Sequence, residues 1–520
     1  MQSVSQHNFA RIPAPKIQRS RFDRSSPYKT TFNAGDLIPI FYDEALPGDS
    51  FKLNASFFCR LNTPIVPIMD NSYLETFFFE VPMRQVWDNW AKFNGEQDNP
   101  GDSTDFLIPQ MVSPATTGYK VGEPQDFFGI PTDVADLTHS ALPFRAMNHI
   151  FNTWFRDQNL QNSVHRQTDD GPDLPSNYPL LKRGKRHDYF TSALPWPQKS
   201  DSGSVQIPLG DRAAVKTDLT DTTTPLSILD GTNAGFQLDS AGSRLLKSGT
   251  TDSNEPSRLY ADLSSATSAT INALRQSIAV QRIFEKDARG GTRLIEITEN
   301  HFGVRSPDLR LQRPGYLGGG KSQINITPVP QQSPSGITPE LTPQGNLAAI
   351  GTVTGSGHGF TKSFTEHTII LGFACVRADL TYSRGLERSW SRLTRFDFYW
   401  PELSTIGEQS ILQKEIWATS LAADNDKVWG YQERNAEYRY KPGLITGKFR
   451  SSETDSLDYW HLSQDFSTVP VLSEAFIQEN PPFQRVVATP AEPQFKMDAY
   501  FNLNCARPMP MYGIPGLHRL

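Results

Sequence analysis

The stretch GYLGGGKS, residues 315–322, could bind phosphate, because it fits the template G-x-x-x-x-G-K-[ST] at every fixed position. In such a loop a buried strand leads through the glycines into a helix, whose first N–H groups hold the phosphates while the lysine neutralises charge. The flanks do not fit, since a charged segment ending at Pro314 precedes the stretch and Pro328, Pro330 and Pro334 exclude a following helix. We therefore predict a glycine-rich surface turn and keep a nucleotide-hydrolysing enzyme as an alternative.

Other patterns of catalysis or metal binding are absent from the sequence. It contains no H-E-x-x-H, EF-hand, Cys/His ribbon or G-x-S-x-G motif. Cys59, Cys375 and Cys505 are far apart, which predicts three buried free thiols rather than a disulfide framework. His139 and His149 are ten residues apart and do not stack on one helix face. We predict no active site, no metal site and no cofactor.

Two basic clusters are candidates for contact with nucleic acid. Lysine and arginine neutralise phosphates, and nearby aromatic rings stack on unpaired bases. The first cluster lies within residues 1–30, where Asp23 is the one carboxylate; the second precedes the aromatic residues Tyr189, Phe190 and Trp196. For the second cluster, a solvated loop is the alternative. The candidate residues are Arg11, Lys16, Arg19, Arg21, Arg24 and Lys29 in the first, and Lys182, Arg183, Lys185 and Arg186 in the second. The formal net charge of −6 excludes a uniformly basic surface.

Alternating apolar residues predict long strands that must position these side chains. Residues 51–61 and 495–505 alternate almost strictly, with Phe58 as an apolar exception on the polar side, and residues 72–81 and 367–383 add two more strands. With 36 glycines, 39 prolines and 37% apolar residues, the composition is typical of a β-sandwich or barrel with long loops. One sheet that uses both ends of the chain must enclose the rest as insertions.

Helices are predicted over 81–95, 142–160 and about 268–288, where apolar residues follow helical spacing. Residues 201–260 are rich in Ser, Thr, Asp and Gly, so they are either disordered or folded only against copies of themselves or the parent domain. Residues 325–359 are rich in Pro and Gly and predict a long loop. No signal-peptide core and no run of eighteen apolar residues occurs, so we predict neither secretion by signal peptide nor membrane insertion.

Several long segments carry a family resemblance. They are LPFRAMNHIFNTWFRDQNLQ (142–161), RGKRHDYFTSALPWPQK (183–199), ARGGTRLIEITENHFGVRSPDLRLQRPGYLGGG (288–320), GYQERNAEYRYKPGLITGKFRS (430–451) and CARPMPMYGIPG (505–516), together with residues 358–403. With them the sequence closely resembles the major capsid protein of gokushoviruses, small icosahedral single-stranded DNA phages within the Microviridae. The resemblance fails only in 211–258 and parts of 325–357.

The resemblance implies an all-β fold, a viral eight-stranded antiparallel jelly roll (β-sandwich) with large inter-strand insertions and a few short helices. It implies a structural protein, not an enzyme, that assembles in the bacterial host cytoplasm from pentamers into a sixty-subunit T=1 shell around circular single-stranded DNA. The implied partners are a small basic internal DNA-packaging protein, a pilot protein, a scaffolding protein and a host surface receptor. A cellular carbohydrate-binding jelly roll is a second alternative to this function.

The implied division of the chain is a basic arm (1–30), a first core part (31–200), an insertion (201–260) and a second core part (261–520). The family's insertion rises at the threefold axes, which assigns the protrusion to 201–260, and we expect its tip to meet the receptor. Candidate protrusion residues are Leu226, Ile228, Leu229, Phe236 and Leu238. The resemblance implies that the stretch 315–322 contains the family's YLGGG turn. Both basic clusters are expected to face the genome.

Overall fold

The structure is a computed structural model that describes residues 17–199, 214–217, 236–238, 245–247, 259–262, 271–291, 293–303, 312–332 and 345–512. The chain divides into two compact units. The first comprises Met1–Pro197 and Pro307–Leu520, and the second comprises Gln198–Ser306. The second unit extends beyond the predicted insertion 201–260, because it includes the helices α4 (Ile271–Gly290) and α5 (Leu294–Phe302).

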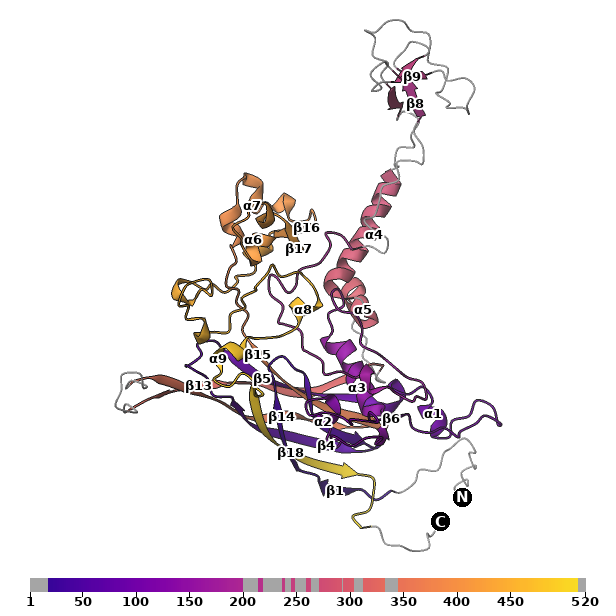
Figure 1. Ribbon diagram of the computed structural model, residues 1–520. Helices are drawn as coiled ribbons and strands as arrows, with labels where there is room; N and C mark the ends of the chain where they lie inside the picture. Colours follow the sequence, from indigo (N-terminus) through magenta and orange to yellow (C-terminus); the bar gives the residue numbers. More distant parts are fainter. Residues whose placement is uncertain are drawn as a thin grey trace, which may run out of the picture. The chain divides into compact units, whose positions relative to one another are not determined.

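The two largest sheets of the first unit are antiparallel (Figure 1). One has the order β1 (Ser20–Asp23), β18 (Phe495–Arg507), β4 (Ser50–Leu61), β14 (Leu347–Ser363) and β13 (Asn325–Pro330), with β2 (Ser26–Phe32) also pairing with β18. The other has the order β12 (Gly315–Gln323), β5 (Ser72–Pro82), β15 (Thr368–Ala378) and β3 (Ile38–Ala45). The predicted all-β class is confirmed. The two sheets have six and four strands, so the predicted number of eight strands is not confirmed.

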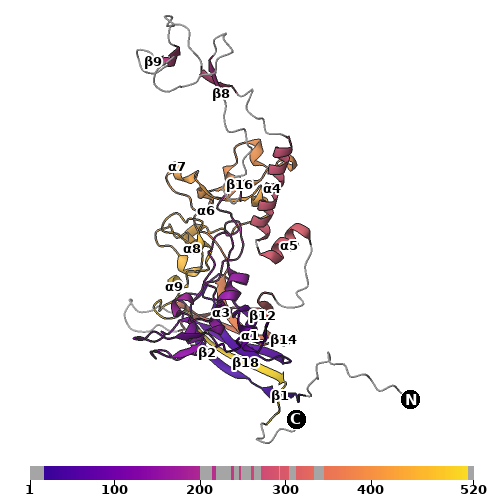
Figure 2. The same cartoon turned by 90° about the vertical axis from the view of Figure 1, so that its right-hand side faces the viewer.

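Strands from both ends of the chain lie in one sheet, as predicted. β1 and β2 pair along β18, with Ser20 opposite Arg507 and Phe32 opposite Phe495 (Figure 2). In β4 and β18 the predicted alternation is confirmed, because every second side chain is buried. Aromatic rings from both sheets meet in this core; the Phe41 and Phe501 centroids are 5.1 Å apart. Removing this apolar surface from water stabilises the sandwich.

β15 differs from the prediction, because it is buried on both faces. One face packs into the core between the sheets, and the other packs with Phe144 of α3 (Leu142–Ile150) in a second hydrophobic cluster. A strand covered on both sides needs no polar face. The alternating strand predicted over 367–383 is therefore wrong in its pattern and in its length, because the strand ends at Ala378.

The glycine-rich stretch is a strand, so the predicted surface turn is wrong. It forms β12, which pairs with β5. A Cβ atom on Gly318 would lie 2.4 Å from the Gly359 carbonyl oxygen of β14, and one on Gly320 would lie 2.4 Å from the His358 ring. Glycine is therefore required because the facing strand approaches the backbone closely.

The last two residues of the phosphate-loop template contact side chains of the neighbouring strands β5 and β14. The Lys321 ammonium lies 3.5 Å from the centroid of the Tyr73 ring, and the Ser322 hydroxyl and the His358 Nε2 atom are 3.0 Å apart. No helix follows, since Ile324 separates β12 from β13. The stretch therefore lacks the strand-to-helix turn that a phosphate loop requires.

The loop predicted over 325–359 is wrong at both ends, where β13 and β14 pair with each other. Pro328 and Pro330 lie in β13, at the edge of the sheet. Proline is tolerated there because its missing N–H group removes no hydrogen bond between interior strands. The alternation of apolar and polar side chains did not reveal β14, because its glycines carry no side chain that could take part in such a pattern. Residues 333–344 lie outside the described part of the chain.

The helix predicted over 142–160 is confirmed over 142–155, as α3 followed by the π-helical turn η2 (Phe151–Phe155), and its predicted end at 160 is wrong. The helix predicted near 268–288 is confirmed as α4. The helix predicted over 81–95 is wrong. It consists of the 3₁₀ turn η1 (Met83–Gln85) and the short α1 (Trp90–Phe93), because the Asp88 N–H donates to the Thr168 carbonyl instead of continuing a helix.

The other elements of the first unit are short. They are β6 (Gln110–Val112), α2 (Pro124–Phe127), β7 (Thr138–Ser140), η3 (Pro175–Asn177), η5 (Arg388–Ser391), η6 (Arg395–Asp397), η7 (Pro401–Leu403), β16 (Glu408–Leu412), α6 (Gln413–Ile416), α7 (Ala422–Asn425), β17 (Val428–Glu433), η8 (Ala436–Tyr438), η9 (Gly447–Phe449), η10 (Asp458–Trp460), α8 (Glu474–Ile477) and α9 (Phe483–Val486). In the second unit β8 (Ala214–Thr217) pairs with β11 (Leu259–Asp262), and β9 (Phe236–Leu238) pairs with β10 (Leu245–Lys247).

The cysteine prediction is confirmed, because Cys59, Cys375 and Cys505 are free and buried. Among the helices of the described ranges, none combines the length and the apolar character needed to cross a lipid bilayer.

Candidate nucleic-acid interface

The basic cluster at 182–186 pairs with groups of its own chain. The Arg183 guanidinium bonds the Glu75 carboxylate and lies 4.5 Å from the centroid of the Phe77 ring. Arg186 bonds Glu75 at 3.1 Å and Asp379 at 3.1 Å. The Lys182 ammonium is 3.6 Å from the Asp36 carboxylate, and the Lys185 ammonium donates to the Gln464 side-chain oxygen at 2.7 Å.

The charge of this cluster balances buried carboxylates. Burial raises the pKa of Glu75, but the positive charges of Arg183 and Arg377 outweigh it and lower that pKa to about 2. Tyr189 and Phe190, predicted to stack on bases, are buried in a hydrophobic cluster instead. The local sequence did not reveal these partners, because Glu75 and Arg377 are distant along the chain. For the genome contact we therefore retain the first cluster alone.

The described part of the N-terminal cluster lies along the edge of the six-stranded sheet. Arg19, Arg21, Arg24 and Lys29 are exposed. Arg24 bonds Asp43, while Arg21 donates to the Asn504 side-chain oxygen at 2.8 Å and Lys29 pairs with Asp498 at 2.9 Å. Arg11 and Lys16 lie outside the described residues.

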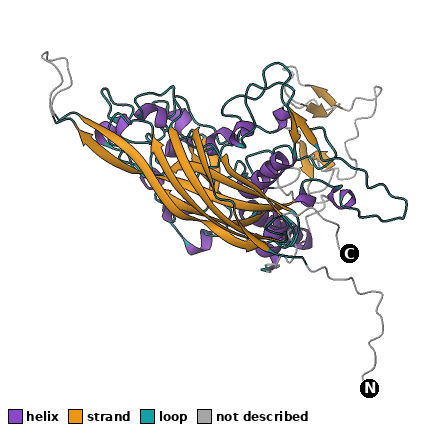
Figure 3. Ribbon diagram, turned by 90° about the horizontal axis from the view of Figure 1, so that it is seen from below, coloured by secondary structure: helices purple, strands orange, loops and turns teal. Residues whose placement is uncertain are grey.

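The six-stranded sheet turns one face to the core and the other to solvent. Figure 3 looks onto the solvent face, where no described helix lies in front of the central strands. Because side chains alternate along a strand, the polar partners of the buried core residues all project here. We call this surface the sheet face. Its defining side chains are Arg21, Lys29, Lys52, Asn54, Ser56, Phe58, Arg60, Lys496, Asp498, Tyr500 and Asn502.

Strand register brings cations of the sheet face together. Lys496 of β18 is opposite Arg60 of β4, and Lys52 is opposite Asn504. Such neighbours on adjacent strands are about 5 Å apart at their Cβ atoms. Asp498 is paired with Lys29 at 2.9 Å, and Lys496 is paired with Glu492 at 3.4 Å. Asp23, opposite Asn504, is a further carboxylate of the face. Among the described residues no ion pair includes Lys52 or Arg60, so these two cations are the ones left to bind an anion.

Two aromatic rings project among these cations. The Phe58 and Tyr500 residues are 49% and 50% exposed, which leaves a ring face open to solvent. Phe58 is opposite Asp498, two residues from Tyr500, so the rings are diagonal neighbours on adjacent strands. Cations beside exposed rings are the arrangement that binds single-stranded nucleic acid, because phosphates pair with the cations while unpaired bases stack on the rings.

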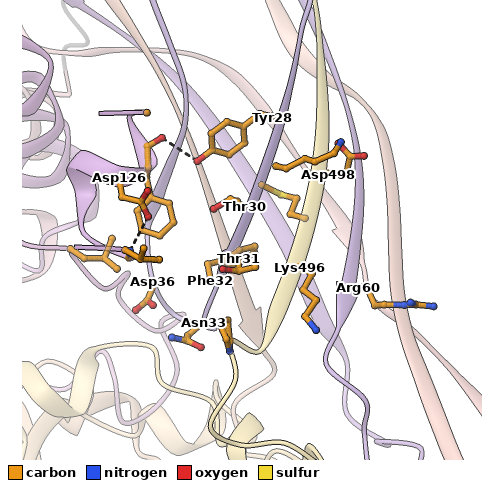
Figure 4. Close-up of a pocket in the computed structure, with 18 of the residues that line it drawn as sticks. Tyr28, Thr30, Thr31, Phe32, Asn33, Asp36, Arg60, Asp126, Lys496 and Asp498 are labelled. Carbon is orange, nitrogen blue, oxygen red and sulfur yellow. Dashed lines mark hydrogen bonds and ion pairs between the residues drawn. The ribbon is translucent and has the colours of Figure 1, made fainter. Parts of the chain in front are cut away.

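A groove lies at the β2 end of the sheet face (Figure 4). Its volume is about 990 Å³, and its walls include Lys29, Phe58, Arg60 and Lys496. Tyr28 forms part of the inner wall and donates its hydroxyl proton to the Phe127 carbonyl at 3.1 Å. A groove of this size accommodates a ligand as large as a nucleotide.

Sequence reasoning missed Lys52, Arg60, Lys496, Phe58 and Tyr500. The alternation of residues 51–61 and 495–505 already placed their side chains on the polar side of two strands. Phe58 broke that pattern as an apolar residue among polar ones, and this irregularity was the feature of the sequence that could have pointed to the sheet face. The sequence did not show that β4 pairs with β18, or in which register.

The candidate protrusion residues are only partly described. Leu226, Ile228 and Leu229 lie outside the described residues, and Phe236 and Leu238 lie in β9, which pairs with β10. Their predicted role stays a prediction.

Comparison with known proteins supplies the family. The phage family described as "Capsid protein (F protein)" matches residues 10–517. The chain is 47% identical to capsid protein VP1 of Bdellovibrio phage phiMH2K, and the match covers 98% of each chain. It is 42% identical to capsid protein VP1 of Chlamydia phage 1, over 100% of this chain and 99% of that one, and 36% identical to capsid protein VP1 of Spiroplasma virus 4, over 99% and 98%. The chain therefore belongs to the phage capsid protein family.

Proposed function

We propose that this capsid protein encloses a single-stranded DNA genome in a closed T=1 icosahedral shell, and that the sheet face and the N-terminal arm contact that genome. The observation that carries the DNA contact is the sheet face itself, where Arg60 and Lys496 lie beside the half-exposed rings of Phe58 and Tyr500, and Lys52 adds a cation farther along β4. Phosphate neutralisation by these cations supplies affinity without sequence preference. Stacking on Phe58 and Tyr500 requires bases that are not paired, which favours a single-stranded genome.

The alternatives receive less support. A nucleotide-hydrolysing enzyme would need a phosphate loop, and the one matching stretch is the strand β12. A carbohydrate-binding jelly roll would use the aromatic rings, but the cations beside them add little to the binding of a neutral sugar. The internal DNA-packaging, pilot and scaffolding proteins, and assembly in the host cytoplasm, remain predictions from the family resemblance.

We predict that the variant K52S/R60S/K496S will package less DNA while still forming particles. Removing three cations should also reduce the salt dependence of binding to oligo(dT), because each phosphate contact contributes about 0.7 to the slope of log K against log salt. The expected slope is therefore smaller by about 2. DNA per particle is measured by absorbance and phosphate content, and binding by fluorescence anisotropy at several salt concentrations.

The matched control is K120S/K427S/K441S, which removes three cations whose side chains are 54–77% exposed and that pair with carboxylates away from the sheet face. It should leave DNA content and salt slope unchanged. The variant F58S/Y500S should weaken oligo(dT) binding by about 1–3 kcal/mol per ring without changing the slope. Equal effects of both triple-serine variants would contradict a specific DNA-binding face.

We also propose that residues 201–260 form the surface protrusion and that their tip contacts the host receptor. The support is their composition, which is too poor in large apolar residues to form a core alone. Exchanging residues 211–258 with those of a related phage should transfer adsorption and host range. A control exchange of residues 333–344 should not. Unchanged adsorption after the first exchange would contradict the receptor role.

A further inference from the structure

A second surface of the first unit exposes more aromatic area than an isolated protein usually does. Between β15 and β16 the chain makes the turns η5, η6 and η7, and η8 lies beside them. We call the exposed side chains of these turns the aromatic patch. They are Trp390 (78% exposed), Leu393 (93%), Phe396 (51%), Phe398 (52%), Tyr399 (51%), Trp400 (44%) and Tyr438 (53%).

Contacts within the patch join most of its rings in two groups. The Arg392 guanidinium lies 5.1 Å from the centroid of the Phe398 ring and 4.6 Å from that of Tyr438. The Tyr438 and Tyr399 centroids are 6.4 Å apart. The Arg395 guanidinium lies 4.6 Å from the centroid of Phe396, and the Trp400 ring N–H donates to the Arg395 carbonyl at 2.8 Å.

The usual order of burial is inverted at this surface. The side chains of Arg392 and Glu437, which form an ion pair, are only 14% and 6% exposed, and Arg388 pairs with the buried Glu415 at 2.8 Å. Charged groups normally remain outside while large aromatic side chains enter the core. The two ion pairs Arg392–Glu437 and Arg388–Glu415 lie beneath the turns and fix their backbone, so that the aromatic rings remain exposed. Rings that are already ordered bind a partner without a further loss of conformational entropy.

The exposed area is close to what one partner contributes to a stable protein interface. At about 200 Å² for each aromatic side chain, the exposed fractions of the six rings amount to roughly 650 Å². The largest apolar patch of a typical monomer is about 300–600 Å², and a standard interface buries about 800 Å² on each partner. Trp, Tyr and Arg, which recur in this patch, are also the residues that most often dominate binding energy at interfaces.

We propose that the aromatic patch is a contact between copies of this chain. The occupant follows from family membership, because a capsid chain meets other copies of itself over much of its surface. In an icosahedral shell such contacts are heterologous around the fivefold and threefold axes and isologous across the twofold axes, so the patch meets either a different surface or the same patch of the neighbouring copy. The inference rests on the proposed shell and adds the residues that join its subunits.

The test uses the full chain with the variant W390S/F398S/Y399S and, separately, L393D. Leu393→Asp places a charge on a residue that is 93% exposed and therefore removes no core contact. Both variants should retain the wild-type far-UV spectrum and oligo(dT) affinity. The critical concentration for assembly, measured by sedimentation velocity and negative-stain electron microscopy, should rise at least a hundredfold. The control L107S/L174S/V471S replaces scattered apolar residues that are 81%, 63% and 71% exposed, and it should assemble normally.

Each of four outcomes would overturn one part of these proposals. Normal shells from both patch variants would overturn the contact between copies and leave the proposed shell intact. Normal shells that no longer adsorb to host cells would assign the patch to a host surface and overturn the same contact. Failure of the control variant to assemble would show that any loss of exposed apolar area acts alike. A wild-type chain that forms a small closed oligomer, which the patch variants dissociate, would overturn the proposed shell and retain the contact.

Discussion

Replacement of Arg145 by Met is expected to lower the free energy of unfolding by about 3–5 kcal/mol, because it leaves the buried Asp173 carboxylate without its counter-charge. The two side chains are 1% and 0% exposed, so water cannot replace the lost partner. The change should be measured by equilibrium urea unfolding of the full chain, with secondary and tertiary structure followed separately.

The geometry explains the size of this effect. Arg145 lies in α3, which is buried along its whole length. Its guanidinium donates to both oxygens of Asp173, at 2.8 and 2.5 Å, and to the carbonyls of Val86 at 3.1 Å and Asp169 at 2.7 Å. The Tyr178 hydroxyl donates to the same carboxylate. One side chain therefore joins the helix, the segment after η1 and the 169–173 loop, and its loss leaves several buried groups unpaired at once.

Arg145→Lys keeps the charge but not the two-pronged geometry, so an intermediate loss is expected. The control is Lys120→Met, which breaks an ion pair whose side chains are 54% and 68% exposed and should cost no more than about 1 kcal/mol. If Arg145→Met and Lys120→Met lose similar stability, the buried pair does not hold this region together.

The sandwich itself could be predicted from the sequence in part. β4 and β18 alternate between core and solvent, and that constraint is visible in each strand alone. β12 and β14 could not be found in this way. Glycine is needed in these strands because strands of opposite sheets come into close contact, as Gly318 does with the Gly359 carbonyl. Composition alone predicts a turn for such a glycine-rich stretch.

The candidate site illustrates the same limit. A run of basic residues such as 182–186 is conspicuous in the sequence, yet Glu75 and Asp379, which are far from it along the chain, neutralise part of its charge. Lys496 and Arg60 are inconspicuous, because each stands alone among uncharged neighbours, and only the pairing of β18 with β4 brings them together. Local charge density therefore pointed to the cluster 182–186, whose charges pair with carboxylates of the same chain. It missed Lys496 and Arg60, which become neighbours only when the strands pair.

A buried acid beside α8 should make stability depend on pH. Glu479 is fully buried, and its N–H donates to the Arg183 carbonyl at 2.7 Å. Burial raises the pKa of the Glu479 carboxyl from its ordinary value of 4.5 to about 7, against the opposing charges of Arg377, Lys185 and Arg183. Burial also lowers the pKa of Lys185 to about 8, against Glu479 and Asp188. Both shifts favour the neutral form of a buried group.

The sign of the effect follows from proton binding. Because the pKa of Glu479 is higher in the folded chain than in the unfolded chain, the folded state binds this proton more tightly. Its contribution to stability is therefore complete below pH 4.5 and is lost as the pH rises to 7. A shift from 4.5 to about 7 corresponds to about 3 kcal/mol. The opposite sign holds for Lys185, whose contribution is complete above its ordinary pKa of 10.5 and is lost as the pH falls through 8.

Glu479→Gln replaces the titrating carboxyl by a neutral group of the same shape, so the variant should lack the decline between pH 4.5 and 7. Relative to wild type, its free energy of unfolding should rise by about 3 kcal/mol over that range. Above pH 7 the stability gained by the Glu479→Gln variant is limited, because the charged Lys185 of the variant lacks the Glu479 carboxylate that compensates its charge in the wild type. Urea unfolding at half-unit steps from pH 4.5 to 8 measures the difference, with Glu474→Gln on the exposed side of α8 as the control. Parallel curves for wild type and Glu479→Gln would mean that the carboxylate stays charged when buried and that the three cations around it outweigh the cost of removing it from water.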